Sequence, residues 1–149
     1  MLVLDHVGIV VDDLDEAVEW YCKHFACRVA WREAATDVDD IAIGLPHEHV
    51  RLRGAVLQAG DRVFLELHQY LVPTGTGNRR VCDTGIGHLA FFTDDIQGDY
   101  RRLLDAGMRF YGAPREITTG GLTGHWWVYG EDPWGNVVQL CHHPDPPAA

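Results

Sequence analysis

The sequence contains an internal repeat that relates its two halves. Residues 5–14 (DHVGIVVDDL) align without a gap with residues 87–96 (GHLAFFTDDI), which lie 82 positions further along the chain. In both copies a histidine precedes an apolar run, and an Asp-Asp pair and an aliphatic residue follow that run. Self-similarity at a fixed offset is typical of a duplicated structural unit, so we expect two copies of one unit.

The hydrophobic period changes from 2 to 3.6 after the Asp-Asp pair of each copy, which predicts a strand followed by a helix. In the first copy Asp13 and Glu16 have the spacing of a capping box. In the second, Asp95 is the expected N-cap, and Gly107 is expected to end the helix. Each helix is followed by three strand-like segments, at residues 28–32, 50–59 and 62–70 in the first half and 109–111, 125–130 and 136–142 in the second. The predicted order is therefore β-α-β-β-β, twice.

This order predicts an α+β fold organised as one compact domain of two modules. We place the first module at residues 1–72 and the second at residues 84–143. Residues 73–83 between them are interpreted as a linker, because their first part is rich in Pro, Gly and Thr and has no hydrophobic period. The last segment, residues 144–149, is predicted to be a frayed tail.

Charge and cysteine content restrict the partners and the compartment. Twelve Lys and Arg residues against 22 Asp and Glu residues give a net charge of −10, which argues against a nucleic-acid or acidic membrane surface. The uncharged runs are shorter than the ~18 residues of a membrane span, and the first residues do not resemble a secretory signal. The four cysteines form no C-x-x-C motif. We therefore expect a cytoplasmic protein with reduced thiols.

Strand side chains alternate between two faces, so their parity assigns each residue to a face. The bulky apolar positions are expected to lie under the helix of each half, which leaves the opposite face without a helix. Four polar side chains fall on this helix-free face at equivalent positions of the repeat: His6, Glu66, His88 and Gln139. A charged Glu within the apolar run VFLEL is costly to desolvate unless it is paired or bound to a metal. We predict that these four residues bind a divalent ion such as Zn, Ni, Co, Mn or Fe(II).

Four further residues are candidates for binding a substrate. His68 shares the face of Glu66, and Trp127 and Tyr129 form an aromatic row on one strand that suits a flat or apolar ligand. Arg53 shares a parity with Ala55, and a hairpin turning at Gly60-Asp61 would place Ala55 opposite Glu66. This register predicts that Arg53 reaches the helix-free face and binds a substrate carboxylate there.

Four motifs resemble the vicinal oxygen chelate superfamily, which includes glyoxalase I, methylmalonyl-CoA epimerase, extradiol dioxygenases and bleomycin resistance proteins. They are DHVGIVVDD near the start, FLEL in the middle, GIGHLAF at the second repeat and DPWGNVVQL near the end. The resemblance extends from Asp5 to His142. It implies paired β-α-β-β-β modules that form a curved, partly open barrel around a metal, and usually a homodimer. By family pattern the ligands fall on His6, Glu66, His88 and Gln139.

The resemblance implies a lyase or isomerase of the glyoxalase I or epimerase type. Such an enzyme chelates two adjacent oxygens of a small molecule and moves a proton through an enolate-like intermediate. Glu66 would be a ligand and the catalytic base, and Gln139 a fourth ligand or an oxyanion donor. If Glu66 stays on the metal, His68, Glu48 or His49 could serve as the base.

This chain departs from the family patterns at its last ligand position. The glyoxalase pattern has a Glu where Gln139 stands, and the epimerase pattern has the Gln in the first half and the Glu in the second. One alternative is an iron(II) extradiol-type dioxygenase, in which His6, His88 and Glu66 would form the metal triad. Another alternative is a small-molecule binding protein of the bleomycin resistance type, which performs no turnover.

Overall fold

The computed structural model describes residues 5–41, 45–61, 63–75, 87–120 and 122–144. The chain divides into two compact units, residues 1–76 and 77–149. Most of the expected linker and most of the expected tail lie outside the described residues, as do the first four residues. The joining of both modules into one compact domain stays a prediction.

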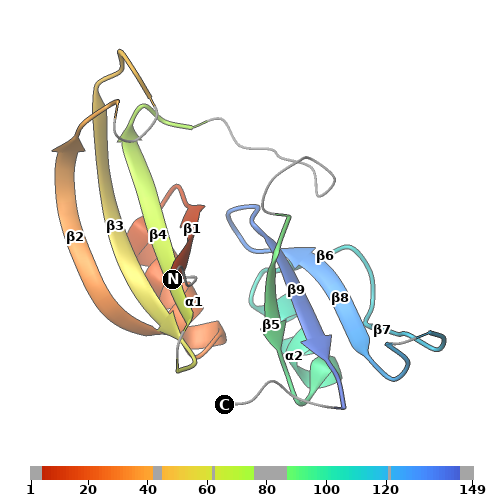
Figure 1. Ribbon diagram of the computed structural model, residues 1–149. Coiled ribbons are helices and arrows are strands. Elements are labelled where there is room, and N and C mark those ends of the chain that lie inside the picture. The colour runs from red at the N-terminus through yellow and green to blue at the C-terminus, as the bar shows by residue number, and fades with distance from the viewer. Residues whose placement is uncertain (1–4, 42–44, 62, 76–86, 121, 145–149) are drawn as a thin grey trace. The chain divides into compact units, whose positions relative to one another are not determined.

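In unit 1 a helix covers one face of a curved, open sheet (Figure 1). Its elements are β1 (His6–Val10), α1 (Leu14–His24), β2 (Arg28–Val38), β3 (Val50–Ala59) and β4 (Val63–Val72). Within the described residues the sheet has four strands in the order β1-β4-β3-β2. β1 is parallel to β4, while β4, β3 and β2 are antiparallel neighbours. The first half therefore folds in the predicted order.

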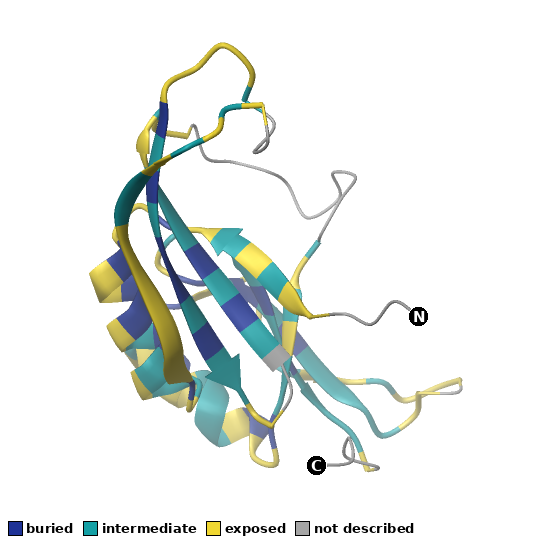
Figure 2. Cartoon of the chain, turned by 60° about the vertical axis from the view of Figure 1, so that its left-hand side comes forward, coloured by how far each residue is buried: buried dark blue, intermediate teal, exposed yellow. Residues whose placement is uncertain are grey.

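The core of unit 1 lies between α1 and the sheet. α1 contributes Leu14, Ala17, Val18 and Tyr21, and the strands contribute Leu57, Leu65 and Leu67 among others. Figure 2 shows these buried positions as dark blue bands on the strands next to the helix. On β1 the exposed positions alternate with half-buried ones, so the parity assignment of faces is confirmed for that strand.

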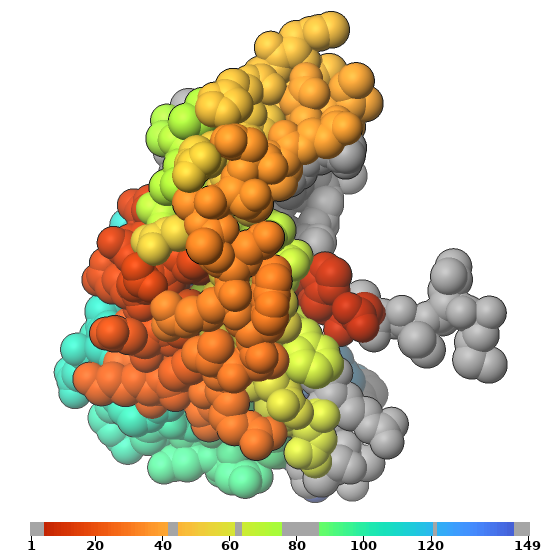
Figure 3. All heavy atoms as spheres, turned by 90° about the vertical axis from the view of Figure 1, so that its left-hand side faces the viewer, coloured from red at the N-terminus to blue at the C-terminus, as the bar shows by residue number. Residues whose placement is uncertain are grey.

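The edge strand β2 is longer than expected, because it continues to Val38 and not only to residue 32. Its register against β3 shifts between Val29 and Trp31 and again between Glu33 and Thr36. These irregularities interrupt the alternation by which a strand is recognised in a sequence. Most of its residues are exposed, as the orange spheres in Figure 3 illustrate.

Unit 2 repeats the arrangement with shorter strands. Its elements are β5 (Leu89–Phe92), α2 (Ile96–Asp105), β6 (Arg109–Phe110), β7 (Arg115–Glu116), β8 (Trp126–Glu131) and β9 (Val137–His142). The described residues form a five-stranded sheet, in which β5-β9-β8-β6 are neighbours and β7 also pairs with β8. β7 was not predicted, because it has two exposed residues and no hydrophobic pattern. The α+β class is confirmed, and the sheet in each unit is open.

The helix ends agree with the predicted caps. Asp13 precedes α1 and its Oδ1 accepts the Glu16 N–H at 3.0 Å, and Asp95 precedes α2 and accepts the Gly98 N–H at 2.9 Å. Gly107 follows α2 with a φ of +95°, a backbone conformation that glycine adopts readily. No helix among the described residues has both the length and the apolar character needed to cross a membrane.

Candidate metal and substrate site

In unit 1 the neighbouring strands β1 and β4 bring His6 and Glu66 together. Gly8 is the register partner of Glu66, and His6 lies two residues earlier on the same face. The Glu66 carboxylate lies over Gly8, where a Cβ would be 3.8 Å from Oε2. His6 Nε2 is 3.3 Å from Glu66 Oε2. The first predicted donor pair is thus in contact.

His6 is oriented by a carboxylate that the sequence analysis did not single out. Asp5 Oδ2 is 2.9 Å from His6 Nδ1, so Nδ1 carries the proton and Nε2 faces Glu66. The hydrogen bond to Asp5 and the nearby charge of Glu66 raise the pKa of His6. A neutral imidazole nitrogen and a carboxylate oxygen are both acceptors, so a proton or a cation is needed to stabilise their approach. The sequence contains one indication of this role, because Asp5 directly precedes His6.

The two oxygens of Glu66 face different histidines. Oε2 faces His6, while Oε1 is 3.6 Å from His68 Nε2. His68 lies against Gly54, its register partner on β3, where a Cβ would be 3.0 Å from His68 Cδ2. A glycine at this position therefore leaves space for the imidazole. The structure places His68 beside Glu66, as the sequence predicted.

In unit 2 the register of His88 and Gln139 is the same as that of the first pair. β5 is parallel to β9, and Ala90 is the partner of Gln139, as Gly8 is of Glu66. His88 lies two residues before Ala90, so it is the counterpart of His6. Each unit thus presents one pair of the predicted donors. Among the described ranges, no three His, Cys, Asp or Glu side chains are arranged to hold a metal ion.

The predicted aromatic row lies beside Gln139. Tyr129 is the register partner of Gln139, and its ring makes an edge contact with His88 at a centroid distance of 4.9 Å. Trp127 lies two residues away on β8, and its ring centroid is 5.4 Å from that of Tyr129. Tyr129 therefore restricts the His88 ring, and Trp127 extends the aromatic surface along the strand.

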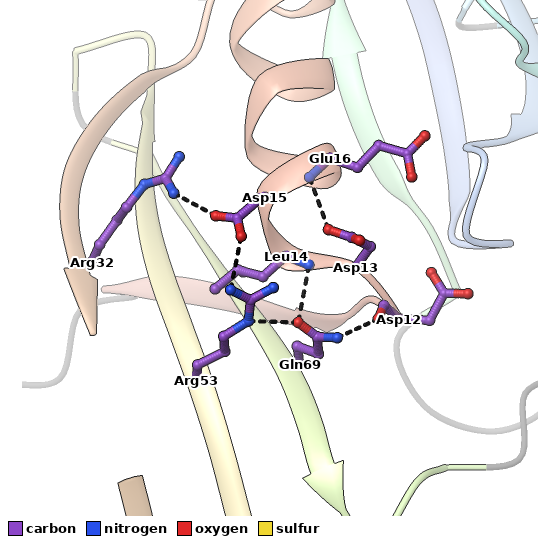
Figure 4. A network of polar contacts seen from close by, with 8 residues as sticks. All are labelled: Asp12, Asp13, Leu14, Asp15, Glu16, Arg32, Arg53 and Gln69. Carbon is purple, nitrogen blue, oxygen red and sulfur yellow. Dashed lines mark hydrogen bonds and ion pairs between the residues drawn. The ribbon is translucent and has the colours of Figure 1, made fainter. Parts of the chain in front are cut away.

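The predicted position of Arg53 is wrong. Glu66 pairs with Val56, and Ala55 pairs with Leu67, so the expected register is shifted by one residue. A one-residue slip moves a side chain to the other face of a sheet. The Arg53 guanidinium accordingly lies on the side of α1, where it donates to Gln69 Oε1 and to Asp15 (Figure 4). It does not share a face with Glu66.

The alternative bases in the loop before β3 lie away from the donor pair. His49 is held by Asp37 Oδ1 at 3.0 Å, at the end of β2, and Glu48 is exposed in the loop. His68 is therefore the candidate base that the structure places next to Glu66.

Comparisons with known proteins agree with this fold. The profile of the Glyoxalase/Bleomycin resistance protein/Dioxygenase superfamily matches residues 3–140. A 2-epi-5-epi-valiolone epimerase from an Actinomyces species is 31% identical over 96% of this chain and 80% of its own length. The crystal structure of a glyoxalase family protein from Bacillus cereus has a TM-score of 0.78 at 21% identity, covering 96% of this chain and 95% of that one. Glyoxalase I from Zea mays has a TM-score of 0.67 at 20% identity, covering 96% of this chain and 45% of that one.

Proposed function

Because this chain belongs to the Glyoxalase/Bleomycin resistance protein/Dioxygenase superfamily, we propose that it is a metal-dependent epimerase of a small molecule with two adjacent oxygens. The observation that carries this proposal is the similarity to an epimerase over 96% of the chain. An epimerase inverts one carbon centre, which requires a proton to leave that carbon and to return on the other side. The chain must therefore bind the substrate, stabilise negative charge next to that carbon and move a proton.

We propose that His6, Glu66, His88 and Gln139 hold the metal ion. Two donors that bind one ion at ~2.1 Å lie about 3.0–3.4 Å apart, and the 3.3 Å between His6 Nε2 and Glu66 Oε2 fits this spacing. The hydrogen bond from His6 to Asp5 supports the proposal, because metal-binding histidines commonly donate their other N–H to a carboxylate. When bound, the ion would supply a Lewis acid for the two substrate oxygens.

The proton transfer is assigned to Glu66 and His68. With Oε2 directed at His6, Oε1 of Glu66 is the oxygen that can accept a proton from the substrate carbon. His68 Nε2, 3.6 Å from Oε1, is placed to exchange a proton with that oxygen. Trp127 and Tyr129 would line the substrate on the side of Gln139. We further propose that the protein is a homodimer, in keeping with the resemblance to its family.

The reaction can be tested with the substrate class of the epimerase relative. The protein, loaded separately with Zn(II), Mn(II), Co(II) or Ni(II), is incubated with 2-epi-5-epi-valiolone in D₂O and followed by NMR. We expect a second epimer to appear and deuterium to enter at the inverted carbon, with no oxygen uptake. Oxygen consumption with iron(II) would instead indicate a dioxygenase. Saturable binding without exchange would indicate a binding protein, and either result would overturn the proposal.

Asp5 provides a test of how His6 is oriented. The substitution Asp5→Asn removes the negative charge that faces Nδ1 of His6. It is expected to weaken zinc binding by about 10- to 100-fold, because the orientation and basicity of the histidine ligand are lost. Zinc affinity is measured by competition with a chromogenic chelator. Glu19→Gln, an exposed substitution on α1, is the control and is expected to leave the affinity unchanged. Equal affinities in the two variants would contradict the role of Asp5.

A further inference from the structure

The edge strand β2 of unit 1 carries an exposed tryptophan, Trp31 (Figure 1). Its exposed fraction is 52%, which is large for an indole. Within the part of the chain that the structure describes, Trp31 makes no ring contact and its indole N–H has no hydrogen-bond acceptor. An indole offers a broad apolar surface for contact with another molecule. What this surface can contact depends on the face of the sheet on which it lies.

The partners of Trp31 and of the next residue fix that face. Trp31 is the register partner of Val56, and Val56 is the register partner of Glu66. The next residue, Arg32, lies on the other face, where its Nη1 is 2.8 Å from Asp15 Oδ1 on α1. Because successive side chains of a strand alternate between the faces, Trp31 lies on the helix-free face, as Glu66 does.

A shift of register in β2 produces this orientation. Val29 is the register partner of Leu57, which is fully buried in the core, whereas Trp31 is the partner of Val56. In a regular strand residues 29 and 31 would share a face, because they are two positions apart. An extra residue in one strand turns the following side chains to the other face, and such bulges are frequent next to active sites. The bulge therefore directs Trp31 to the face of the proposed metal ligands.

The register places Trp31 at the end of a row that contains Glu66. The row crosses the helix-free face through Gly8, Glu66, Val56 and Trp31, one residue from each strand. Neighbouring strands are ~4.8 Å apart, so the backbones of Glu66 and Trp31 are about 10 Å apart. The half-buried Val56 lies between them. A ring held at Glu66 by two adjacent oxygens would extend over Val56 to the indole, whereas a short open chain would end before it.

Unit 2 has an exposed aromatic residue at the equivalent end of its donor row. That row runs from Ala90 through Gln139 to Tyr129. The next position is Tyr111, whose backbone N–H donates to the Tyr129 carbonyl oxygen at 2.9 Å and which is 55% exposed. Its hydroxyl donates to Glu131, two residues from Tyr129 on the same face. The repetition indicates that an aromatic residue at this position belongs to the design of the face and is not an isolated exposed side chain.

We propose that Trp31 stacks on the ring of a cyclic substrate and thereby selects ring-shaped molecules with two adjacent oxygens over open-chain ones. The inference rests on the proposed function, because the metal ion held by Glu66 would position the ring. Trp31 touches the far side of the ring and not the carbon that exchanges its proton. It is therefore a residue that determines specificity.

Two small chelators test the selection without any turnover. Maltol carries its two adjacent oxygens on a six-membered ring, and acetohydroxamate carries them on a short open chain. Both are added to the Zn(II)-loaded protein, and binding is followed by the ¹H–¹⁵N signal of the Trp31 indole, which is assigned with a Trp31→Phe variant. We expect a saturable shift of this signal with maltol and none with acetohydroxamate, although both bind.

Affinities of variants, measured by calorimetry, assign the effect to the indole. Trp31→Ala is expected to weaken maltol binding about tenfold, because the ring loses its stacking surface, and to leave acetohydroxamate binding unchanged. Trp31→Phe keeps an aromatic face and is expected to retain most of the affinity for maltol. Val29→Ala is the matched control, since it removes another exposed apolar side chain of β2 from the opposite face. It is expected to change neither affinity.

The outcomes separate this inference from the proposed function. Unaltered maltol affinity in Trp31→Ala, or an equal loss for both chelators, would overturn the role of Trp31, while the proposed metal site would stand. If neither chelator binds the Zn(II)-loaded wild-type protein, the metal site is wrong and the role of Trp31 is overturned with it. A Trp31 signal that shifts with protein concentration and not with maltol would identify a second copy of the chain as its partner, which also overturns the proposal.

Discussion

Replacement of Glu66 by alanine is expected to remove the bound metal ion and the epimerase activity together. Glu66 is the single carboxylate in the proposed ligand set, and its Oε1 is the proposed proton acceptor. Loss of a hydrogen-bonding partner of a ligand costs about 10- to 100-fold in metal affinity, so loss of a ligand should cost at least 100-fold. Metal content is measured by mass spectrometry after purification without chelator, and activity by deuterium exchange.

The variant is compared with Glu33→Gln, which alters an exposed carboxylate on β2. This control is expected to retain both the metal and the activity. After the metal has been removed from both variants with a chelator, their thermal unfolding should be similar, because the Glu66 side chain is 25% exposed and lies on the surface of the sheet. Stoichiometric metal in a folded Glu66→Ala variant, or its absence from the wild-type protein, would show that the ligand assignment is wrong.

Replacement of Asp132 by alanine is expected to destabilise the protein by about 3 kcal/mol, because buried donors lose their acceptor. Asp132 is fully buried in the turn between β8 and β9. Its Oδ1 accepts the N–H groups of Trp134 and Asn136 at 3.0 and 2.7 Å, and its Oδ2 accepts Asn136 Nδ2 at 2.8 Å. The turn leads directly into the strand of Gln139. The free energy of unfolding is measured by urea denaturation.

Pro133→Ala is the control for this substitution, since Pro133 is exposed in the same turn. It is expected to change the free energy of unfolding by less than about 1 kcal/mol. Similar losses in the two variants would mean that the turn backbone, and not the Asp132 carboxylate, stabilises this connection.

Much of each unit could be predicted from local patterns. The caps at Asp13 and Asp95 follow from side-chain hydrogen bonds that span only three residues, so they are readable in a sequence. The face on which His6 and Glu66 lie follows from the alternation of side chains within each strand. The parallel pairing of β1 with β4 then brings the two side chains together. The two-residue strand β7 has no such pattern, and backbone pairing with β8 alone defines it.

The sequence by itself determined the duplicated β-α-β-β-β unit, the caps and the face on which His6 and Glu66 lie, since each depends on neighbours along the chain. Only the tertiary structure decided the register of β3 against β4, and with it the side of the sheet that Arg53 occupies. That register depends on how turns and bulges join the strands. A slip of one residue moves every side chain of the strand to the other face of the sheet. The tertiary structure likewise decided that the Arg53 guanidinium joins β3 to the start of α1, because its partners Gln69 and Asp15 are distant from it in sequence.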